Sequence, residues 1–471
     1  MPAPDNIYED DVDFTTLALQ YPDFAERLKP NRQLDFSDPE SVRQLTKCLL
    51  HRDFSLTIDL PDDRLCPPVP NRFNYILFIQ RLLDDTSPDF HEGYDPERHL
   101  LGLDIGTGSS AIYPLLACAQ RPGWRFLCTE IDDKNCQYAL RNIAANNLGS
   151  RIRMIDTDRT GENLIPTDHL DRFERVDVLV TNPPFYSSEA ELLGSAGQKF
   201  RPPNSSCTGA AVEMITPGGE VSFVGKLVRE SAQRRNRHKI QWCSAMLGKL
   251  SSVGEVVAHL RNEGCTNLAV TEFVQGQKTR RWCVAWSWMG FRPGVDVARG
   301  VGSGSGVERK WLPPLTEMDF EVENGDGEGD GDARDVAEKV AREVRKLDGV
   351  VWKFNRAKGV GMFMAREGDV WSRKARRKAQ AKAKGKAHHD TVMEDRESED
   401  DDDADGGPQS ESELEPALVA RISIKTLPPP PPVTGTGSKS TIHLRHLQGH
   451  DAVLFESFCG WLKRKVVPPS T

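Results

Sequence analysis

Strand-like and helical segments alternate between residues 98 and 292, and this alternation restricts the fold more than any other feature of the chain. A chain in which apolar strands alternate with helices builds a doubly wound, mostly parallel sheet with helices on both faces. We therefore predict an α/β, Rossmann-like domain whose seven strands cover residues 100–105, 125–130, 151–155, 176–181, 219–225, 268–273 and 282–288. Ligands of such sheets bind beyond the carboxyl ends of the strands, so functional side chains are expected there.

The tetrapeptide Asn182-Pro183-Pro184-Phe185 directly follows the apolar run 176–181. The side-chain oxygen of Asn182 and the carbonyl of Pro183 can accept both hydrogens of an amino group whose lone pair is delocalised. Preorganised acceptors stabilise a transition state, and consecutive prolines hold them in place. Phe185 offers a ring face on which a flipped base can stack. The four residues therefore indicate methyl transfer onto a planar nitrogen, with a plain proline-rich strand exit as the alternative.

The first predicted strand runs into the turn 104–108, which reads Asp-Ile-Gly-Thr-Gly. Closely spaced glycines let the backbone pass near a ligand, as dinucleotide and S-adenosylmethionine folds require. The next strand ends at Glu130, where an acid can hold the two ribose hydroxyls of a nucleoside. Ala111 replaces the third glycine of nicotinamide enzymes, and the acidic entrance suits a cationic cofactor. We therefore expect S-adenosylmethionine rather than NAD, with these cofactor-binding residues: Asp104, Gly106, Gly108 and Glu130.

Composition limits the compartment and the partners of the protein. The 10 cysteines form no Cys-x-x-Cys pair and no cluster with histidine, which predicts neither a metal site nor a disulfide framework and indicates a reducing compartment. We expect no secretion signal, because residues 1–5 do not begin a basic and then apolar segment, and no membrane partner, because no apolar run approaches about 18 residues. The formal net charge is −9, but acid is concentrated in 317–335 and 394–405, whereas 199–292 is basic and suits a phosphate backbone.

The segments outside the α/β region predict an extension and a second domain. Residues 1–95 have apolar residues at helical spacing and predict a helical N-terminal extension. Residues 293–332 are rich in glycine and acid and predict a disordered linker. Beyond it, 333–372 and 416–467 each supply a helix and two strands. We predict that they form one split α+β domain around a disordered basic and acidic insertion, 373–415.

Nine short motifs follow one another within residues 1–292: Tyr21-Pro22-Asp23-Phe24, Ser37-Asp38-Pro39-Glu40, Val69-Pro70-Asn71-Arg72-Phe73-Asn74-Tyr75-Ile76, the turn 104–108, Ile112-Tyr113-Pro114-Leu115-Leu116, Thr129-Glu130-Ile131-Asp132-Asp133, Asn182-Pro183-Pro184-Phe185, Met246-Leu247-Gly248-Lys249 and Thr271-Glu272-Phe273. In sequence and order they resemble the RlmF / methyltransferase-like protein 16 family of RNA adenine-N6 methyltransferases. The C-terminal region resembles the RNA-binding domain of the eukaryotic branch, which has a kinase-associated-1-like fold. The resemblance implies a class I S-adenosylmethionine-dependent methyltransferase that forms N6-methyladenosine in an ACAGA-type element of U6 small nuclear RNA.

The resemblance also assigns roles to individual residues. The family's cofactor contacts fall on Arg72, Gly106, Glu130, Thr160 and Asn182. Arg72 would bind the methionine carboxylate, a task suited to a guanidinium, although by itself it would be interpreted as a helix-surface arginine. The sequence around Thr160 departs from the family pattern. The RNA-facing positions implied by the family are Lys199, Arg201, Lys249, Lys278, Arg280 and Arg281.

Two other functions fit part of the pattern. Protein glutamine methyltransferases carry the same Asn-Pro-Pro followed by an aromatic residue, usually tyrosine, and a non-catalytic RNA-binding scaffold could retain the fold. Phe185 and the basic segments favour an RNA methyltransferase, expected as a monomer, with mRNA hairpins as candidate further substrates. The basic cluster 373–378 predicts a nuclear protein, with the cytoplasm as a second location.

Overall fold

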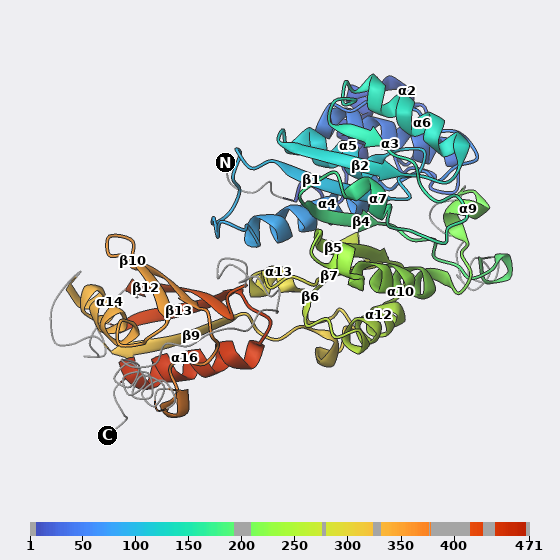
Figure 1. Cartoon of the computed structure of the whole chain (residues 1–471). Coiled ribbons are helices and arrows are strands. Elements are labelled where there is room, and N and C mark those ends of the chain that lie inside the picture. The colour runs from blue at the N-terminus through green and yellow to red at the C-terminus, as the bar shows by residue number, and fades with distance from the viewer. Residues whose placement is uncertain are drawn as a thin grey trace, which may run out of the picture. The chain divides into compact units, whose positions relative to one another are not determined.

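The computed structural model describes residues 6–192, 209–275, 279–323, 331–375, 377, 415–426 and 439–467. The chain divides into two compact units (Figure 1). The first comprises Met1–Met289 and Val295–Pro313, and the second comprises Gly290–Gly294 and Pro314–Thr471. The five-residue segment between Met289 and Val295 therefore belongs to the second unit, not to the methyltransferase domain predicted to end at residue 292.

One sheet forms the core of the first unit. Its strands are β1 (Leu100–Ile105), β2 (Trp124–Thr129), β3 (Ile152–Met154), β4 (Val176–Thr181), β5 (Ile240–Leu247), β6 (Asn267–Gln275), β7 (Thr279–Ser287) and β8 (Arg299–Gly300). Their order is β3-β2-β1-β4-β5-β7-β6-β8, and the pairings from β3 to β5 are parallel, whereas β7 is antiparallel to both neighbours. The predicted mostly parallel sheet is confirmed, but among the described residues it has eight strands rather than seven, and the short β8 is one of them.

Helices cover both faces of this sheet. Along β4, Val178 and Val180 belong to one hydrophobic cluster and Leu179 belongs to the other, as expected for a strand buried on both sides. The helices that follow the first strand are α5 (Ile112–Gln120), α6 (Asp133–Ala145), α7 (Thr167–Leu170), α9 (Ala211–Met214), α10 (Gly219–Ala232), α11 (Arg234–Arg237), α12 (Leu250–Asn262) and α13 (Val295–Ala298).

The strand predicted over 219–225 is wrong, because these residues form the first half of helix α10. Val221 and Phe223 alternate with polar residues as they would in a strand. The residues that α10 buries nevertheless include Val224, Leu227 and Val228, which recur at helical spacing. The fifth parallel strand is β5, which is buried along its whole length although it contains two polar side chains.

The N-terminal extension is helical, as predicted, but it is not separate from the sheet. Its helices are α1 (Phe14–Gln20), α2 (Pro22–Ala25), α3 (Pro39–Phe54) and α4 (Val69–Asp85). The carboxylate of Asp38 caps α3 by accepting from the backbone of Glu40 and Ser41. Nearly every side of α4 is buried, and its residues share one hydrophobic cluster with the sheet. A boundary at residue 95 therefore does not divide two cores, and both segments fall in the same unit.

The disordered linker predicted over 293–332 is wrong for much of its length. It contains α13, β8 and the strand β9 (Glu317–Glu323), while 324–330 lie outside the described residues. In β9, Phe320 and Val322 are buried and alternate with acidic residues. Glu317, Asp319 and Glu323 lie opposite bases on the neighbouring strand β13 (Lys439–Gln448), as in the Asp319–His443 contact of 2.7 Å. These acids therefore belong to a half-buried edge strand.

The second unit is a five-stranded antiparallel sheet in the order β10-β11-β12-β13-β9, packed against two helices. The remaining elements are β10 (Val350–Asn355), β11 (Val360–Ala365), β12 (Leu418–Thr426), α14 (Gly331–Val344) and α16 (Ala452–Val466). Strands β11 and β12 pair along six residues, although they come from the two separate pieces of the chain. Phe363 of β11 stacks on Phe458 of α16, with ring centroids 4.2 Å apart. The two pieces thus share one core.

Most of the predicted insertion 373–415 lies outside the described residues. Within the described part of the chain, no helix is both long and apolar enough to cross a membrane.

We predict that the insertion is dispensable for folding of the second unit. Deleting residues 387–413 should leave the thermal unfolding of the full chain nearly unchanged, because each halving or doubling of loop length changes the closure free energy by only about 0.6 kcal/mol. Phe458→Ala should destabilise the second unit by about 3–5 kcal/mol, the usual cost of removing a core phenylalanine. Scanning calorimetry measures both effects. A cooperative melt of an isolated 310–370 fragment would contradict a shared core.

Candidate active site

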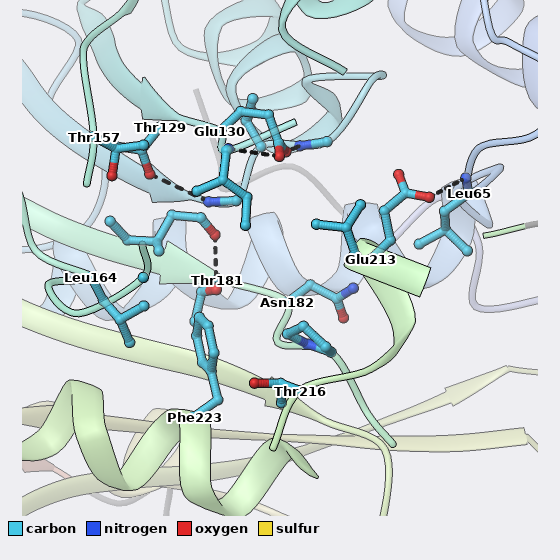
Figure 2. A pocket seen from close by; sticks show the side chains of 18 of the residues that line it. Leu65, Thr129, Glu130, Thr157, Leu164, Thr181, Asn182, Glu213, Thr216 and Phe223 are labelled. Atoms are coloured by element: carbon cyan, nitrogen blue, oxygen red, sulfur yellow. Dashed lines mark hydrogen bonds between the residues drawn. The ribbon is translucent and has the colours of Figure 1, made fainter. Parts of the chain in front are cut away.

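A cavity of about 560 Å³ lies at the carboxyl ends of β1, β2 and β4. Figure 2 shows Glu130, Glu213 and Asn182 around this cavity, with Thr216 and Phe223 closing it from the segment that contains α10. The predicted residues that line the cavity are Arg72, Gly106, Gly108, Glu130, Thr160, Asn182 and Pro184. The sequence motifs therefore meet where the sheet topology predicts a ligand site.

The turn after β1 provides an open backbone cradle. Gly106 and Gly108 have φ values of +72° and +66°, a left-handed conformation that glycine adopts at no steric cost. A Cβ built on Gly106 would meet no atom within 4 Å, so the backbone faces open space. Beneath the turn, Asp104 is fully buried and accepts a hydrogen bond of 2.7 Å from the Thr107 hydroxyl. Burial raises the pKa of Asp104 to about 7.

Glu130 lies at the end of β2 and faces the same turn. Its carboxylate accepts backbone hydrogen bonds from Gly108 at 2.8 Å, Ile131 at 2.9 Å and Asp132 at 3.0 Å. Burial raises the pKa of Glu130 above its usual range, and the nearby Glu213 raises it further. A cation bound in the cavity would favour the charged forms of both acids, which suits a positively charged ligand.

Arg72 and Asn182 contact each other across the cavity. The Arg72 guanidinium donates to Asn182 Oδ1 at 3.2 Å and to Met246 Sδ at 3.0 Å. It lies 5.6 Å from the centroid of the Tyr113 ring. Arg72 is buried, so the interpretation as a helix-surface arginine is wrong. The buried helix α4 instead delivers one guanidinium to the end of β4.

The tetrapeptide after β4 is held from both ends. The Thr181 hydroxyl donates to the Ile105 carbonyl at 2.9 Å, which joins the end of β4 to the end of β1. After the motif, the Tyr186 N–H donates to the Met214 carbonyl at 3.0 Å and the Thr216 N–H donates to the Tyr186 carbonyl at 2.9 Å. Pro183 is buried and Phe185 is partly buried, and neither lines the cavity.

Thr160 lies in the loop that borders the cavity beside α10. Its hydroxyl and its backbone N–H both bind Asp158, at 2.6 and 2.9 Å. Lys226 of α10 donates to the Gly161 carbonyl, and Glu230 accepts from the Leu164 N–H at 2.9 Å. The loop is therefore attached to α10 as well as folded upon itself, and Thr160 is an exposed residue at the cavity margin.

The three predicted RNA-facing residues that the structure describes, Lys249, Arg280 and Arg281, do not line the cavity. Lys199, Arg201 and Lys278 lie outside the described residues. The Lys249 ammonium pairs with Glu191 at 2.5 Å, and the Arg280 guanidinium pairs with Glu272 at 2.6 Å. The Arg281 guanidinium lies 5.8 Å from the centroid of the Phe185 ring.

Glu213 is a cavity residue that sequence analysis missed. Its carboxylate accepts from the Leu65 N–H and the Ala210 N–H, both at 2.9 Å, and from the Asn135 amide at 3.3 Å. It thus joins the helical extension, α6 and the start of α9, and burial raises its pKa. The local contact with Ala210 does not mark such a residue by itself, because its other two partners, Leu65 and Asn135, are distant in sequence. Among the described residues, no group of three or more histidine, cysteine or acidic side chains could hold a metal ion.

The site combines a glycine cradle and an acidic wall with one guanidinium for an anion. These residues fit a nucleoside that carries both a cationic centre and a carboxylate, as S-adenosylmethionine does. Fold and site together define a class I methyltransferase.

Comparison with known proteins identifies the family. Residues 3–290 match the family model for an RNA methyltransferase, and the chain belongs to this family. It is 36% identical over 352 residues to the U6 small nuclear RNA (adenine-(43)-N(6))-methyltransferase of Schizosaccharomyces pombe, covering 75% of this chain and 84% of the relative. It is 39% identical over 292 residues to the Homo sapiens RNA N(6)-adenosine-methyltransferase METTL16, covering 60% of this chain and 50% of the relative.

The first unit also resembles a solved structure. The hMettl16 catalytic domain in complex with MAT2A 3′UTR hairpin 1 superposes with a TM-score of 0.51 and 37% sequence identity. The match covers 60% of this chain and 94% of that one.

Asn182→Ala tests the assignment of the tetrapeptide. Losing one transition-state acceptor should lower single-turnover methyl transfer by roughly 10²–10³-fold. RNA affinity should barely change. Asn31→Ala is a matched control, because it removes the same amide at an exposed position that is distant in sequence from Asn182. A variant that keeps more than about a third of the wild-type rate would exclude Asn182 from the mechanism, since a contact of this kind contributes far more.

Proposed function

We propose that this protein is an S-adenosylmethionine-dependent RNA methyltransferase that forms N6-methyladenosine in an ACAGA-type element of U6 small nuclear RNA. The observation that carries the proposal is the meeting of Asn182 with the glycine cradle and Glu130 in one cavity. Structured mRNA hairpins are proposed as further substrates. The two relatives named above act on RNA adenine N6 by their names, and the solved neighbour holds an RNA hairpin.

The cavity residues support binding of S-adenosylmethionine, which supplies an electrophilic methyl group on a sulfonium centre. Arg72 would bind the methionine carboxylate through its guanidinium. Glu130 would accept hydrogen bonds from the ribose hydroxyls, and the backbone at Gly106 and Gly108 would pass close to the methionine. The buried Asp104 and the partly buried Glu213 would favour the positive charge through their negative potential.

The tetrapeptide would prepare the target amine. Asn182 Oδ1 and the Pro183 carbonyl would accept its two N–H hydrogens and so favour a pyramidal, nucleophilic nitrogen. Arg72 now donates to Asn182 Oδ1. We propose that Arg72 turns to the cofactor carboxylate and thereby releases this oxygen for the amine. Phe185 would stack on the flipped adenine, and the residues Lys199, Arg201, Lys249, Lys278, Arg280 and Arg281 would contact the RNA backbone.

Methylation of a U6 small nuclear RNA transcript by the full chain tests the activity. Mass spectrometry of nucleosides should detect N6-methyladenosine, because the cavity brings the acceptor residues to the cofactor site. The matched control is a transcript in which guanine replaces the adenines of the ACAGA-type element, and it should gain no methyl group. Methylation of a glutamine-containing peptide but not of RNA would favour a protein methyltransferase, and binding without transfer would favour a scaffold.

We further propose that the protein acts in the nucleus, where U6 small nuclear RNA is processed. The basic cluster 373–378 is of the kind that serves nuclear import or nucleic-acid contact. Replacing its five lysines and arginines by glutamine should lower the nuclear fraction of a fluorescently tagged full-length chain. Complete nuclear accumulation of this variant would place the import signal elsewhere.

A further inference from the structure

Glu220 is a buried carboxylate outside the cofactor cavity. It lies in the first turn of α10 and is 2% exposed. It accepts hydrogen bonds from the Gly248 N–H at 2.7 Å, the Lys249 N–H at 3.1 Å and the Ser252 hydroxyl at 2.6 Å. These donors surround the start of α12, whose N-cap residue provides no side-chain cap of its own. A side chain of α10 therefore caps the start of α12.

The N-terminal ends of α10 and α12 both favour a negative charge at Glu220. The free N–H groups at a helix N-terminus carry partial positive charge and stabilise an acid in the first turn. Burial nevertheless raises the pKa of Glu220, and the charged side chain that faces it is Lys249, which itself pairs with Glu191. Removing the acceptor would deprive the Gly248 and Lys249 N–H groups and the buried Ser252 hydroxyl of their shared partner, which favours displacement of this turn.

The turn that Glu220 holds forms one side of the Phe185 environment. A Cβ built on Gly248 would lie 2.9 Å from Cδ1 and 3.2 Å from Cε1 of Phe185, closer than real side chains approach. A side chain at this position would overlap the ring edge, so glycine fits here without a shift of either group. Because the turn lies this close to Phe185, a displacement of the turn changes the space available to the ring.

The start of α10 also lies beside the motif. A Cβ on Gly219 would lie 3.4 Å from the Phe185 carbonyl oxygen, and Gly219 has a φ of +66°. Glu220 therefore follows a residue that packs on the backbone of Phe185, and its own carboxylate fixes the turn that packs on the ring of Phe185. The adjacent parallel strands β4 and β5 deliver Phe185 and Gly248 to the same edge of the sheet.

We propose that Glu220 is a positioning residue for the reaction: by fixing the Gly248–Lys249 turn, it holds the Phe185 ring in the orientation that stacks on the flipped adenine. The inference rests on the proposed function, because that function assigns the stacking role to Phe185. Glu220 itself touches neither the cofactor cavity nor the reacting atoms.

The experiment compares four variants of the full chain. Glu220→Gln keeps the size of the side chain but directs an N–H donor toward other donors, and Gly248→Ala pushes a methyl group against the ring. Phe185→Ala removes the ring itself. Gly254→Ala is the matched control. Gly254 lies in α12, and a Cβ there would meet Trp311 at 2.7 Å rather than Phe185. For each variant we would measure kcat and KM for the U6 transcript, S-adenosylmethionine affinity and thermal stability.

Glu220→Gln and Gly248→Ala should each lower kcat on the order of tenfold, within the range that a lost base–aromatic stack allows. Cofactor affinity should stay within about twofold, and Gly254→Ala should retain its kcat. In a transcript with 2-aminopurine at the methylated position, both variants should change the fluorescence of the bound base as Phe185→Ala does. In the Phe185→Ala background, Glu220→Gln should lower kcat no further, because the two changes act through one contact.

Two results would overturn the inference while leaving the proposed function intact. One is a Glu220→Gln enzyme with wild-type kcat and an unchanged 2-aminopurine signal. The other is a Glu220→Gln enzyme that loses kcat only in proportion to its loss of thermal stability, with both losses equal to those of Gly254→Ala. If the wild-type chain methylates no RNA, the proposed function fails and this inference fails with it.

Discussion

The active site depends on the register of three parallel strands. Ile105 of β1 pairs with Thr129 of β2 on one side and with Thr181 of β4 on the other. The next residue along each strand is Gly106, Glu130 or Asn182, so the register alone places the glycine turn, the acid and the amide in one row. The hydrogen bond from Thr181 to the Ile105 carbonyl reinforces this register at the last pair. A slip of one strand would separate the site, because every side chain would move to the opposite face.

Elements that are distant in sequence add the other residues that surround Gly106, Glu130 and Asn182. Helix α4 is buried and brings Arg72 to Asn182, while Glu213 ties the extension to α6 and α9. Helix α10 attaches to three segments: it binds the 157–165 loop through Lys226 and Glu230, the motif backbone through Gly219, and the start of α12 through Glu220. A single helix thus contacts the surroundings of both the proposed cofactor and the proposed base.

The second unit follows a different principle, because two separate pieces of the chain contribute to one core. Residues from both pieces belong to a single hydrophobic cluster. The β11–β12 ladder and the Phe363–Phe458 stack join them. The edge strand β9, with three of its acids opposite bases of β13, extends the same sheet.

The sequence by itself determined the α/β class, the helical extension, the position of both motifs at strand ends and the partition of the C-terminal region. These features depend on local periodicity and on residues with special backbone properties, such as Gly106 or Pro183, and both are legible in a single chain. Only the tertiary structure decided that 219–225 is helical, that β9 belongs to a sheet, that Arg72 is buried against Asn182 and that Glu213 and Glu220 hold distant segments. In each case the deciding contact joins residues far apart in sequence. Val224, Phe320 and Glu220 acquire their roles from what packs against them, and no local pattern records that packing.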